Sequence, residues 1–377
     1  MKKFIKWFFI IFISINVVLL LTGKFYYWKA LIYNYVNIDD LDIFYSDTVK
    51  TGDGAEWKLS SLYNKKELSA ELLSELGQFQ SVAFLMIHND SIEYEKYWDG
   101  YSDSSLSNSF SMAKSIIGAL VGIAIQEGKI GSLDDPVAMY VPKFDKAENR
   151  QLTLRHLITM SSGLNWDEQY ASLTSQTTEA YYGKRLFHHM MRLKVVTPPG
   201  KYFDYMSCNT QILAYVIRNA TGKSVSQYAS EKIWKPVHAM HDARWSMVRK
   251  GGAEKAYCCF YSNARDFARI GKLYLDSGRW EGKQLVPEKY VLESLTPAPI
   301  MDGNQPNKNY GYHWWLDTIS GKKVFYARGI LGQYIIVIPS LNAIIVRLGK
   351  ERDKNPDGSL RDVPLYVQEA ISRWQSG

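Results

Sequence analysis

The sequence has few cysteines and no spacing of cysteine and histidine that is typical of a metal site. Its three cysteines are Cys208, Cys258 and Cys259. Neighbouring cysteines rarely bridge each other and three is an odd number, so we expect no disulfide framework. The spacing of His238 and His241 comes closest to that of a metal-binding motif, but we interpret both as loop and packing residues. The sequence therefore predicts no bound metal and no disulfide scaffold.

The chain also lacks concentrated basic blocks, internal repeats and low-complexity segments. Its net charge of +7 is spread along 377 residues, without the interleaved aromatic and basic residues of a nucleic-acid stripe. We therefore expect no nucleic-acid partner. The apolar and charged fractions, 46% and 22%, are those of an ordinary globular protein. The length allows one large domain or two smaller ones.

A long apolar run, residues 4–21, follows the basic N-terminus. The run is about long enough to span a bilayer, and aromatic residues 26–28 stand where an interfacial belt would lie. A cleaved signal peptide is the alternative, but residues 20–23, Leu-Leu-Thr-Gly, make a poor cleavage site. We favour an uncleaved anchor. Its basic end would stay inside, which places the rest of the chain in the periplasm or the exterior.

Residues 111–126 are apolar or small at nearly every position, which predicts a helix that is buried all round. Ser111 and Lys114 stand at its start, and their spacing places them on one face. A serine needs a base before it can act as a nucleophile, and a desolvated lysine is such a base. A capping serine beside a surface lysine is the alternative. The buried helix favours a catalytic pair, with the N–H of Ser111 available to a developing oxyanion.

Two further segments offer partners for this pair. Tyr205 and Ser207 follow a Pro-Pro-Gly turn, in a predicted loop before a helix. A tyrosine beside a lysine is a workable proton shuttle, and Ser207 or Asn209 would orient it or bind substrate; a packing tyrosine is the alternative. Gly329 lies in a predicted strand, where glycine marks close approach by a ligand or another chain. The N–H of Ile330 would then be a second oxyanion donor, unless the glycine marks only a hairpin bulge.

The pattern of predicted elements indicates an α+β fold, in which helices flank an antiparallel sheet and a helical lobe is inserted. Strands are expected within 81–98 and within 312–348, with helices between them and a last helix over 365–374. A cleft should lie between lobe and sheet. The predicted division is as follows: anchor 1–23, tether and lead-in 24–76, and catalytic domain 77–377, with a sheet lobe over 77–130 and 250–377 and a helical lobe over 131–249.

The three motifs, in this order, resemble the Ser-x-x-Lys, Tyr-x-Asn and Lys-Thr-Gly motifs of the serine β-lactamase and penicillin-binding superfamily. Segments such as 131–136 and 261–269 are similar to its class C β-lactamase-like branch. Within that branch, Ser-Met-Ala-Lys-Ser and Gly-Ile-Leu-Gly-Gln most resemble the 6-aminohexanoate-dimer hydrolases and related esterases. The resemblance covers about residues 78–375, and it implies a β-lactamase/transpeptidase-like fold.

The resemblance also implies roles for residues. Ser111 would be acylated, Lys114 and Tyr205 would act as general base and acid, and the N–H groups of Ser111 and Ile330 would form the oxyanion hole. No metal or cofactor is implied. We predict a membrane-anchored serine hydrolase that acts on a small amide, ester or peptide. The alternatives are a β-lactamase or D-alanyl-D-alanine carboxypeptidase, and a penicillin-binding-type sensor without turnover.

Two positions depart from the family pattern. Ser207 stands in the place of the asparagine of Tyr-x-Asn, and Ala327 in the place of the lysine of Lys-Thr-Gly. Arg328 is adjacent, but neighbouring residues of a strand point to opposite faces, so we expect that it does not substitute. The family uses that lysine partly to hold a substrate carboxylate. We therefore predict that short neutral esters or amides are better substrates than penicillins or D-alanyl-D-alanine peptides.

Overall fold

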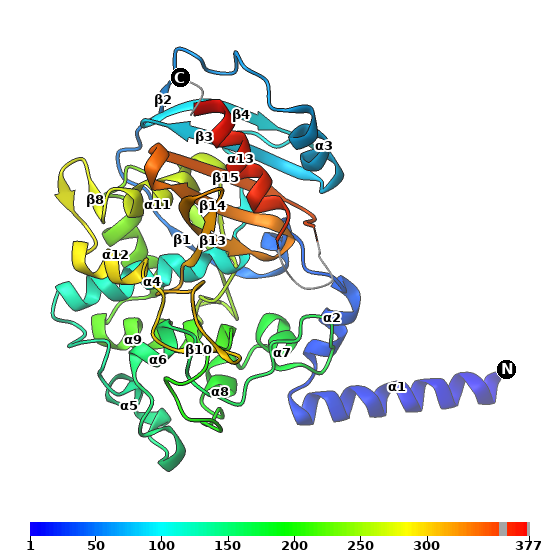
Figure 1. The fold of residues 1–377 in the computed structure, drawn as a ribbon. Helices are drawn as coiled ribbons and strands as arrows, with labels where there is room; N and C mark the ends of the chain where they lie inside the picture. The colour runs from blue at the N-terminus through cyan, green and yellow to red at the C-terminus, as the bar shows by residue number, and fades with distance from the viewer. Residues whose placement is uncertain (354–359, 375–377) are drawn as a thin grey trace.

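The computed structural model describes residues 1–353 and 360–374 of the chain (Figure 1). A seven-stranded sheet runs in the order β12-β13-β14-β15-β3-β4-β2. Its strands are β2 (Lys58–Leu59), β3 (Ser81–His88), β4 (Ser91–Tyr97), β12 (Trp315–Ile319), β13 (Lys322–Gly329), β14 (Gln333–Ile338) and β15 (Ala343–Gly349). All neighbours are antiparallel except β2, which pairs parallel to β4. The pairing of β15 with β3 joins an N-terminal and a C-terminal part of the chain in one sheet. The antiparallel sheet with flanking helices confirms the predicted α+β class.

Both faces of this sheet are covered, which explains its nearly continuous apolar strands. Phe84 and Met86 of β3 face one core cluster, with α3 (Ala70–Gln78) and α13 (Asp362–Trp374). Leu85 and Ile87 face the other cluster, which contains α11 (Ala264–Leu275) and the central helix. Because alternate side chains of a strand point to opposite faces, one apolar run serves both cores.

A second sheet, which the sequence did not predict, has the order β1-β6-β7-β5. Its strands are short: β1 (Tyr45–Val49), β5 (Ser107–Asn108), β6 (Ala243–Met247) and β7 (Phe260–Ser262). Strand β1 comes from the segment expected to be a tether. That segment also holds η1 (Asp40–Ile43) and α2 (Tyr26–Tyr33), whose Tyr26 and Ala30 are buried. Much of the lead-in is therefore folded against the rest of the molecule.

The inserted lobe is mainly helical (Figure 1). It consists of α5 (Val137–Tyr140), η3 (Pro142–Phe144), η4 (Ala147–Asn149), α6 (Leu154–Ile158), α7 (Gln176–Tyr182), α8 (Leu186–Met190), α9 (Ser207–Thr221), α10 (Val225–Ala229) and η5 (Ser230–Trp234). Outside the lobe, α12 (Glu288–Ser294) and the hairpins β8–β9 (Arg279–Trp280, Lys283–Gln284) and β10–β11 (Met301–Asp302, Gln305–Pro306) complete the fold.

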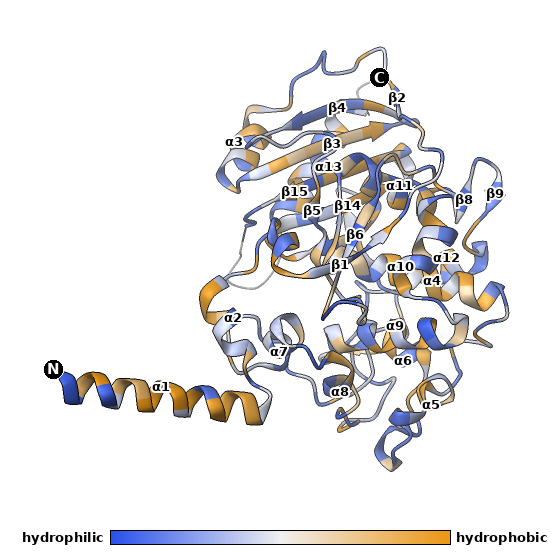
Figure 2. Cartoon of the chain, turned by 180° about the vertical axis from the view of Figure 1, so that it is seen from behind, coloured by the Kyte–Doolittle hydropathy of each residue, from blue (hydrophilic) through white to orange (hydrophobic). Residues whose placement is uncertain are grey.

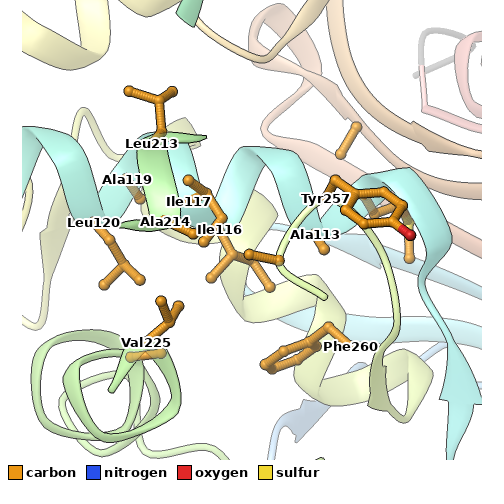
Figure 3. Close-up of a cluster of buried hydrophobic side chains, with 14 of the residues drawn as sticks. Ala113, Ile116, Ile117, Ala119, Leu120, Leu213, Ala214, Val225, Tyr257 and Phe260 are labelled. Carbon is orange, nitrogen blue, oxygen red and sulfur yellow. The ribbon is translucent and has the colours of Figure 1, made fainter. Parts of the chain in front are cut away.

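The central helix, α4 (Ala113–Gln126), lies between lobe and sheet and packs against α9. Every residue from Ala113 to Ala124 is buried, as predicted. Figure 3 shows Ile116, Ile117 and Leu120 of this helix among side chains from several other segments. A Cβ at Gly122 would lie 2.5 Å from the ring of Tyr290, so the small residues of α4 admit close neighbours.

Helix α1 (Lys2–Thr22) has no buried residue and extends away from the rest of the chain (Figure 2). Its most apolar window has a mean hydropathy of 2.5. Its length and composition suffice to span a membrane, although a signal sequence near an N-terminus has the same properties. Gly23 ends the helix in a left-handed conformation.

The structure corrects one expectation about the cysteines. Cys258 and Cys259 form a disulfide, whereas neighbouring cysteines were expected to remain unbridged. Cys259 adopts a left-handed conformation with φ 65°, so the two residues lie in a turn rather than in an extended strand. Cys208 is free and buried. The bridged pair stands between Tyr257 and strand β7, at one side of the site described next.

Candidate active site

Ser111 is the middle residue of a single 3-10 turn, η2 (Phe110–Met112), between β5 and α4. Phe110 has φ 43°, a left-handed conformation that is costly for a bulky residue and is found at functional sites. The side chain of Asn108 holds the turn: its Oδ1 accepts from the N–H of Phe110 at 3.0 Å. The chain therefore presents Ser111 on a strained turn, just before the buried helix predicted to begin there.

Lys114 is almost fully buried and is surrounded by hydrogen-bond acceptors. Its Nζ donates to Ser111 Oγ at 2.9 Å, to Ser207 Oγ at 3.2 Å and to the carbonyl of Tyr257 at 2.9 Å. These three acceptors match the three N–H groups of an ammonium. The structure thus joins Ser111, Lys114 and Ser207, three of the predicted site residues. Ser207 is the first residue of α9, whereas the sequence placed it in a loop.

Tyr205 lies beside the same lysine. Lys114 Nζ is 5.0 Å from the centroid of its ring. Trp315 and Tyr310 hold the other sides of that ring, with centroids 5.5 and 6.1 Å away. The predicted proton shuttle is therefore in the same cluster as the predicted base.

Gly329 ends β13, and Ile330 opens the turn η6 (Ile330–Gly332). A Cβ at Gly329 would overlap the carbonyl oxygen of Ser109 and would lie 3.2 Å from the Cβ of Phe110. The close neighbour of this glycine is therefore the turn that carries Ser111. Because of that contact, the backbone of Ile330 lies next to the Ser111 turn. The oxyanion role of their two N–H groups stays a prediction.

Ala327 and Arg328 point to opposite faces of β13, as the sequence led us to expect. Ala327 is buried in the core cluster that contains α4. The Arg328 guanidinium lies 4.0 Å above the ring of Trp315, which is paired across the sheet with Tyr326. Arg328 therefore does not stand in the place of the missing lysine.

Sequence reasoning missed Glu168, which lies in the loop between α6 and α7. Its carboxylate accepts from the N–H and the hydroxyl of Ser207, at 2.7 and 2.6 Å. It also accepts from the indole of Trp166 and the hydroxyl of Tyr170, both at 2.5 Å. The sequence shows a glutamate between two aromatic donors at 166–170. Nothing in that local pattern connects it to Ser207, which is 39 residues further along.

His313 lies deep behind Lys114. Burial, and secondarily the positive charge of Lys114, lower its pKa to about 3, so the imidazole is neutral. Its Nε2 is 3.0 Å from the hydroxyl of Thr210, and its carbonyl accepts from Ser115 at 2.6 Å. The buried imidazole near Lys114 is therefore neutral, and Ser207 links Lys114 to the carboxylate of Glu168.

The arrangement suits acyl transfer. It combines a serine hydroxyl, an amine within hydrogen-bond distance of it, a neighbouring phenol and the N-terminal end of a helix. Among residues 1–353 and 360–374, no group of three or more His, Cys, Asp or Glu side chains is placed to hold a metal ion.

Comparison with known proteins agrees with this geometry. A family model described as "Beta-lactamase" matches residues 70–364, well over half of the chain. A 6-aminohexanoate-dimer hydrolase from Paenarthrobacter ureafaciens is 26% identical over 304 residues, covering 75% of this chain and 76% of that protein. An uncharacterized Alkalihalophilus pseudofirmus protein is 25% identical over 315 residues, covering 77% of this chain and 89% of its own length.

The solved structures agree in fold. A structure described as "Putative 6-aminohexanoate-dimer hydrolase from Bacillus anthracis" superposes with a TM-score of 0.77 at 21% identity, covering 90% of this chain and 93% of that one. A family VIII carboxylesterase has a TM-score of 0.62 at 16% identity, covering 81% of this chain and 99% of its own. At these identities the likeness establishes the fold alone.

Proposed function

The chain belongs to the beta-lactamase family, and from that premise we propose that it is a serine hydrolase which cleaves amide or ester bonds through a Ser111 acyl-enzyme. The observation that carries the proposal is the contact of 2.9 Å between Lys114 Nζ and Ser111 Oγ, in a buried cluster. A surface lysine or a merely capping serine would not need such surroundings.

The proposed reaction has two halves. In the first, neutral Lys114 takes the proton of Ser111 as Oγ bonds to the substrate carbonyl carbon. The ammonium so formed is held by Ser207 and by the carbonyl of Tyr257. The proton then passes by way of Tyr205 to the amine nitrogen or alcohol oxygen as its bond to the carbonyl carbon breaks. In the second half a water molecule gives a proton along the same route, its oxygen bonds to the acyl carbon, and the bond of that carbon to Ser111 breaks as Oγ takes the proton back. The N–H groups of Ser111 and Ile330 would stabilise the oxyanion in both halves.

The proposed substrates are short amides and esters without a carboxylate next to the scissile bond. Ala327 supports this choice, because it places a methyl group where the family has a cation. The relative from Paenarthrobacter ureafaciens, a 6-aminohexanoate-dimer hydrolase by name, supports an amidase or esterase over a β-lactamase. The β-lactamase, carboxypeptidase and sensor alternatives are outcomes of the test below.

We also propose that α1 is retained as a single-pass anchor in the cytoplasmic membrane, with the catalytic part facing the periplasm or exterior. Fractionation should find the full-length chain in membranes. N-terminal sequencing of a mature form that begins near Lys24 would contradict the anchor and favour a cleaved signal peptide.

Intact mass spectrometry tests the function. The protein is exposed separately to a fluorophosphonate, a p-nitrophenyl ester and a penicillin, and the mass added to Ser111 is followed over time. We expect permanent labelling by the phosphonate, transient acylation and turnover with the ester, and slow or no reaction with the penicillin. Ser111→Ala should abolish all three reactions, while Ser104→Ala, at an exposed serine nearby in the sequence, should change none of them.

Other outcomes identify the alternatives. Rapid penicillin turnover would indicate a β-lactamase, and release of D-alanine from a D-alanyl-D-alanine peptide would indicate a carboxypeptidase. A stable penicillin adduct without turnover would indicate a sensor. Labelling at Ser109 or Ser115 in place of Ser111 would overturn the assignment of the nucleophile.

A further inference from the structure

We propose that Glu168 is a positioning residue of the acylation centre, which acts on Lys114 through the hydroxyl of Ser207. The inference rests on the function proposed above. It concerns a residue that neither the three sequence motifs nor the comparisons identify.

The direction of the hydrogen bonds carries the argument. The hydroxyl of Ser207 has one proton, and it donates this proton to Glu168 Oε1 at 2.6 Å. Only lone pairs of Ser207 Oγ therefore remain for Lys114 Nζ, 3.2 Å away. A hydroxyl held in this way can accept from the lysine but cannot donate to it.

That restriction matters when Lys114 is neutral. A neutral amine has one lone pair, and this lone pair must face Ser111 to take its proton. Without Glu168, the Ser207 hydroxyl would be free to turn and donate to the same lone pair. Glu168 prevents this competition, so the lone pair stays available to Ser111.

The carboxylate itself is held in one orientation. Four donors converge on its two oxygens: the N–H and O–H of Ser207, the indole of Trp166 and the hydroxyl of Tyr170. Two carboxylate oxygens offer about four acceptor positions, so the set is matched. A glutamine offers one oxygen, and its amide N–H groups would face donors. The site therefore requires an anion at this position.

The negative charge has a second effect. Once Lys114 has taken the proton, Glu168 is the carboxylate linked to the ammonium through one hydroxyl, and it favours the charged form. The other ionisable groups that face this cluster come from the loop of Glu168, the start of α9 and the loops before β7 and β12: Tyr170, Asp204, Tyr205, Cys208, Tyr257 and His313.

Three of these neighbours, Cys208, Tyr257 and His313, are neutral near pH 7. Burial raises the pKa of Cys208 and of Tyr257 well above their usual values, and the charge of Glu168 adds to this effect. Burial lowers the pKa of His313 to about 3. Burial, with Glu168 as the second cause, raises the pKa of Asp204. Removal of Glu168 should therefore leave Lys114 without the carboxylate that is linked to it through the hydroxyl of Ser207.

The test measures the rate of fluorophosphonate labelling at Ser111, and kcat and KM for a p-nitrophenyl ester, between pH 5 and 10. We expect Glu168→Gln to lower kcat and the labelling rate about 10- to 100-fold with little change in KM. The acidic limb of both profiles should move to lower pH, because an ammonium without the anion loses its proton more easily. Ser207→Ala should move the limb in the same direction.

Two further variants distinguish a positioning role of Glu168 from a general loss of structure around the site. Glu168→Asp keeps the charge, so its acidic limb should stay close to that of the wild type even if kcat falls. The double variant Glu168→Gln/Ser207→Ala should be no slower than the slower single variant, because the two residues act as one unit. Glu148→Gln is the matched control, since Glu148 lies in the same lobe and pairs with Lys194 at the surface. It should behave as the wild type.

Each result decides one question. If Ser111 is labelled but Glu168→Gln keeps the wild-type limb, the inference is wrong and the proposed function stands. If the wild type is not labelled at Ser111, the proposed function fails and the inference fails with it. If Glu168→Gln does not fold, as judged by its melting temperature, Ser207→Ala and Glu168→Asp still decide the matter.

Discussion

The two walls of the candidate active site are built in different ways. The helical wall consists of Lys114, Ser207, Glu168 and the loop of Tyr257, and it presents polar groups that are matched one to another. The strand wall is the end of β13, which carries the buried Ala327 and the backbone of Gly329. Under the proposed function the helical wall would carry proton transfer, whereas Ala327 and Gly329 would offer a substrate no charged group. If the proposed function holds, we expect the chemistry of the family to be kept and the substrate specificity to differ.

The strongest test of this difference between the two walls is to place a cation on the strand wall. Ala327→Lys should improve kcat/KM for nitrocefin and for a D-alanyl-D-alanine peptide by about two to three decades. The physical reason is the charge-assisted hydrogen bond that a substrate carboxylate would gain. The rate for a neutral p-nitrophenyl ester should change much less.

Ala327 is buried, so the added bulk needs its own control. Ala327→Met adds a chain of similar length without charge, and it should improve neither anionic substrate. Efficient nitrocefin turnover by the wild type would contradict the prediction, because another cation would then have to hold the carboxylate.

The next largest effect is expected where the two walls meet. Gly329→Ala would place a Cβ against the carbonyl of Ser109, and overpacking of this kind costs about 1–3 kcal/mol of stability. A displacement of about 1 Å at the nucleophile or its oxyanion donors lowers the rate about 100-fold. Urea unfolding and ester hydrolysis measure the two effects. The matched control is Gly77→Ala in α3, where a Cβ would meet no atom within 4 Å, and it should be neutral or stabilising.

Part of the helical wall could be predicted from the sequence. Ser111 and Lys114 are three residues apart, and their helix is apolar on every face, so both the pair and its burial could be predicted from a short window. Six of the seven strands of the larger sheet were equally visible as apolar or alternating runs, whereas β2, of two exposed residues, was not predicted. These features depend on local periodicity, which a sequence displays directly.

Features that depend on contacts between distant segments were not visible. Glu168 is joined to Ser207 across 39 residues. Glycine at 329 predicted close approach by a ligand or another chain, but the sequence did not identify the turn of Ser111 as its near neighbour. The second sheet is built from strands of two to five residues, too short for alternation to stand out. Cys258 and Cys259 form a disulfide, and the left-handed conformation of Cys259 could not be predicted from their spacing.

A smaller effect is expected behind the helical wall, at His313. Its pKa is about 3 in the folded chain and about 6.5 when unfolded, so between these values only the unfolded chain binds the proton. Stability is therefore lost as the pH falls below about 6.5, by up to about 1.4 kcal/mol per pH unit. Between pH 6.5 and 5 this amounts to about 2 kcal/mol.

His313→Asn isolates that contribution, because asparagine tolerates the left-handed conformation, φ 59°, of this position. Urea unfolding midpoints at pH 7 and pH 5 should fall less in the variant than in the wild type. Equal falls would show that His313 is not the group that titrates. Other histidines contribute equally to both proteins and cancel in the comparison.

The smallest effect is expected outside both walls, at the N-terminus. Deletion of residues 1–23 removes α1, which has no buried residue, so a soluble protein with unchanged kcat/KM should result. Deletion of residues 1–28 also removes Tyr26, which is buried beside α7, and this should cost about 2 kcal/mol of stability while leaving the site intact. Melting temperatures and ester hydrolysis of the two truncations measure the difference. If the shorter deletion already lowers kcat/KM, α1 contributes to the fold of the catalytic part, and the boundary we draw at Gly23 is wrong.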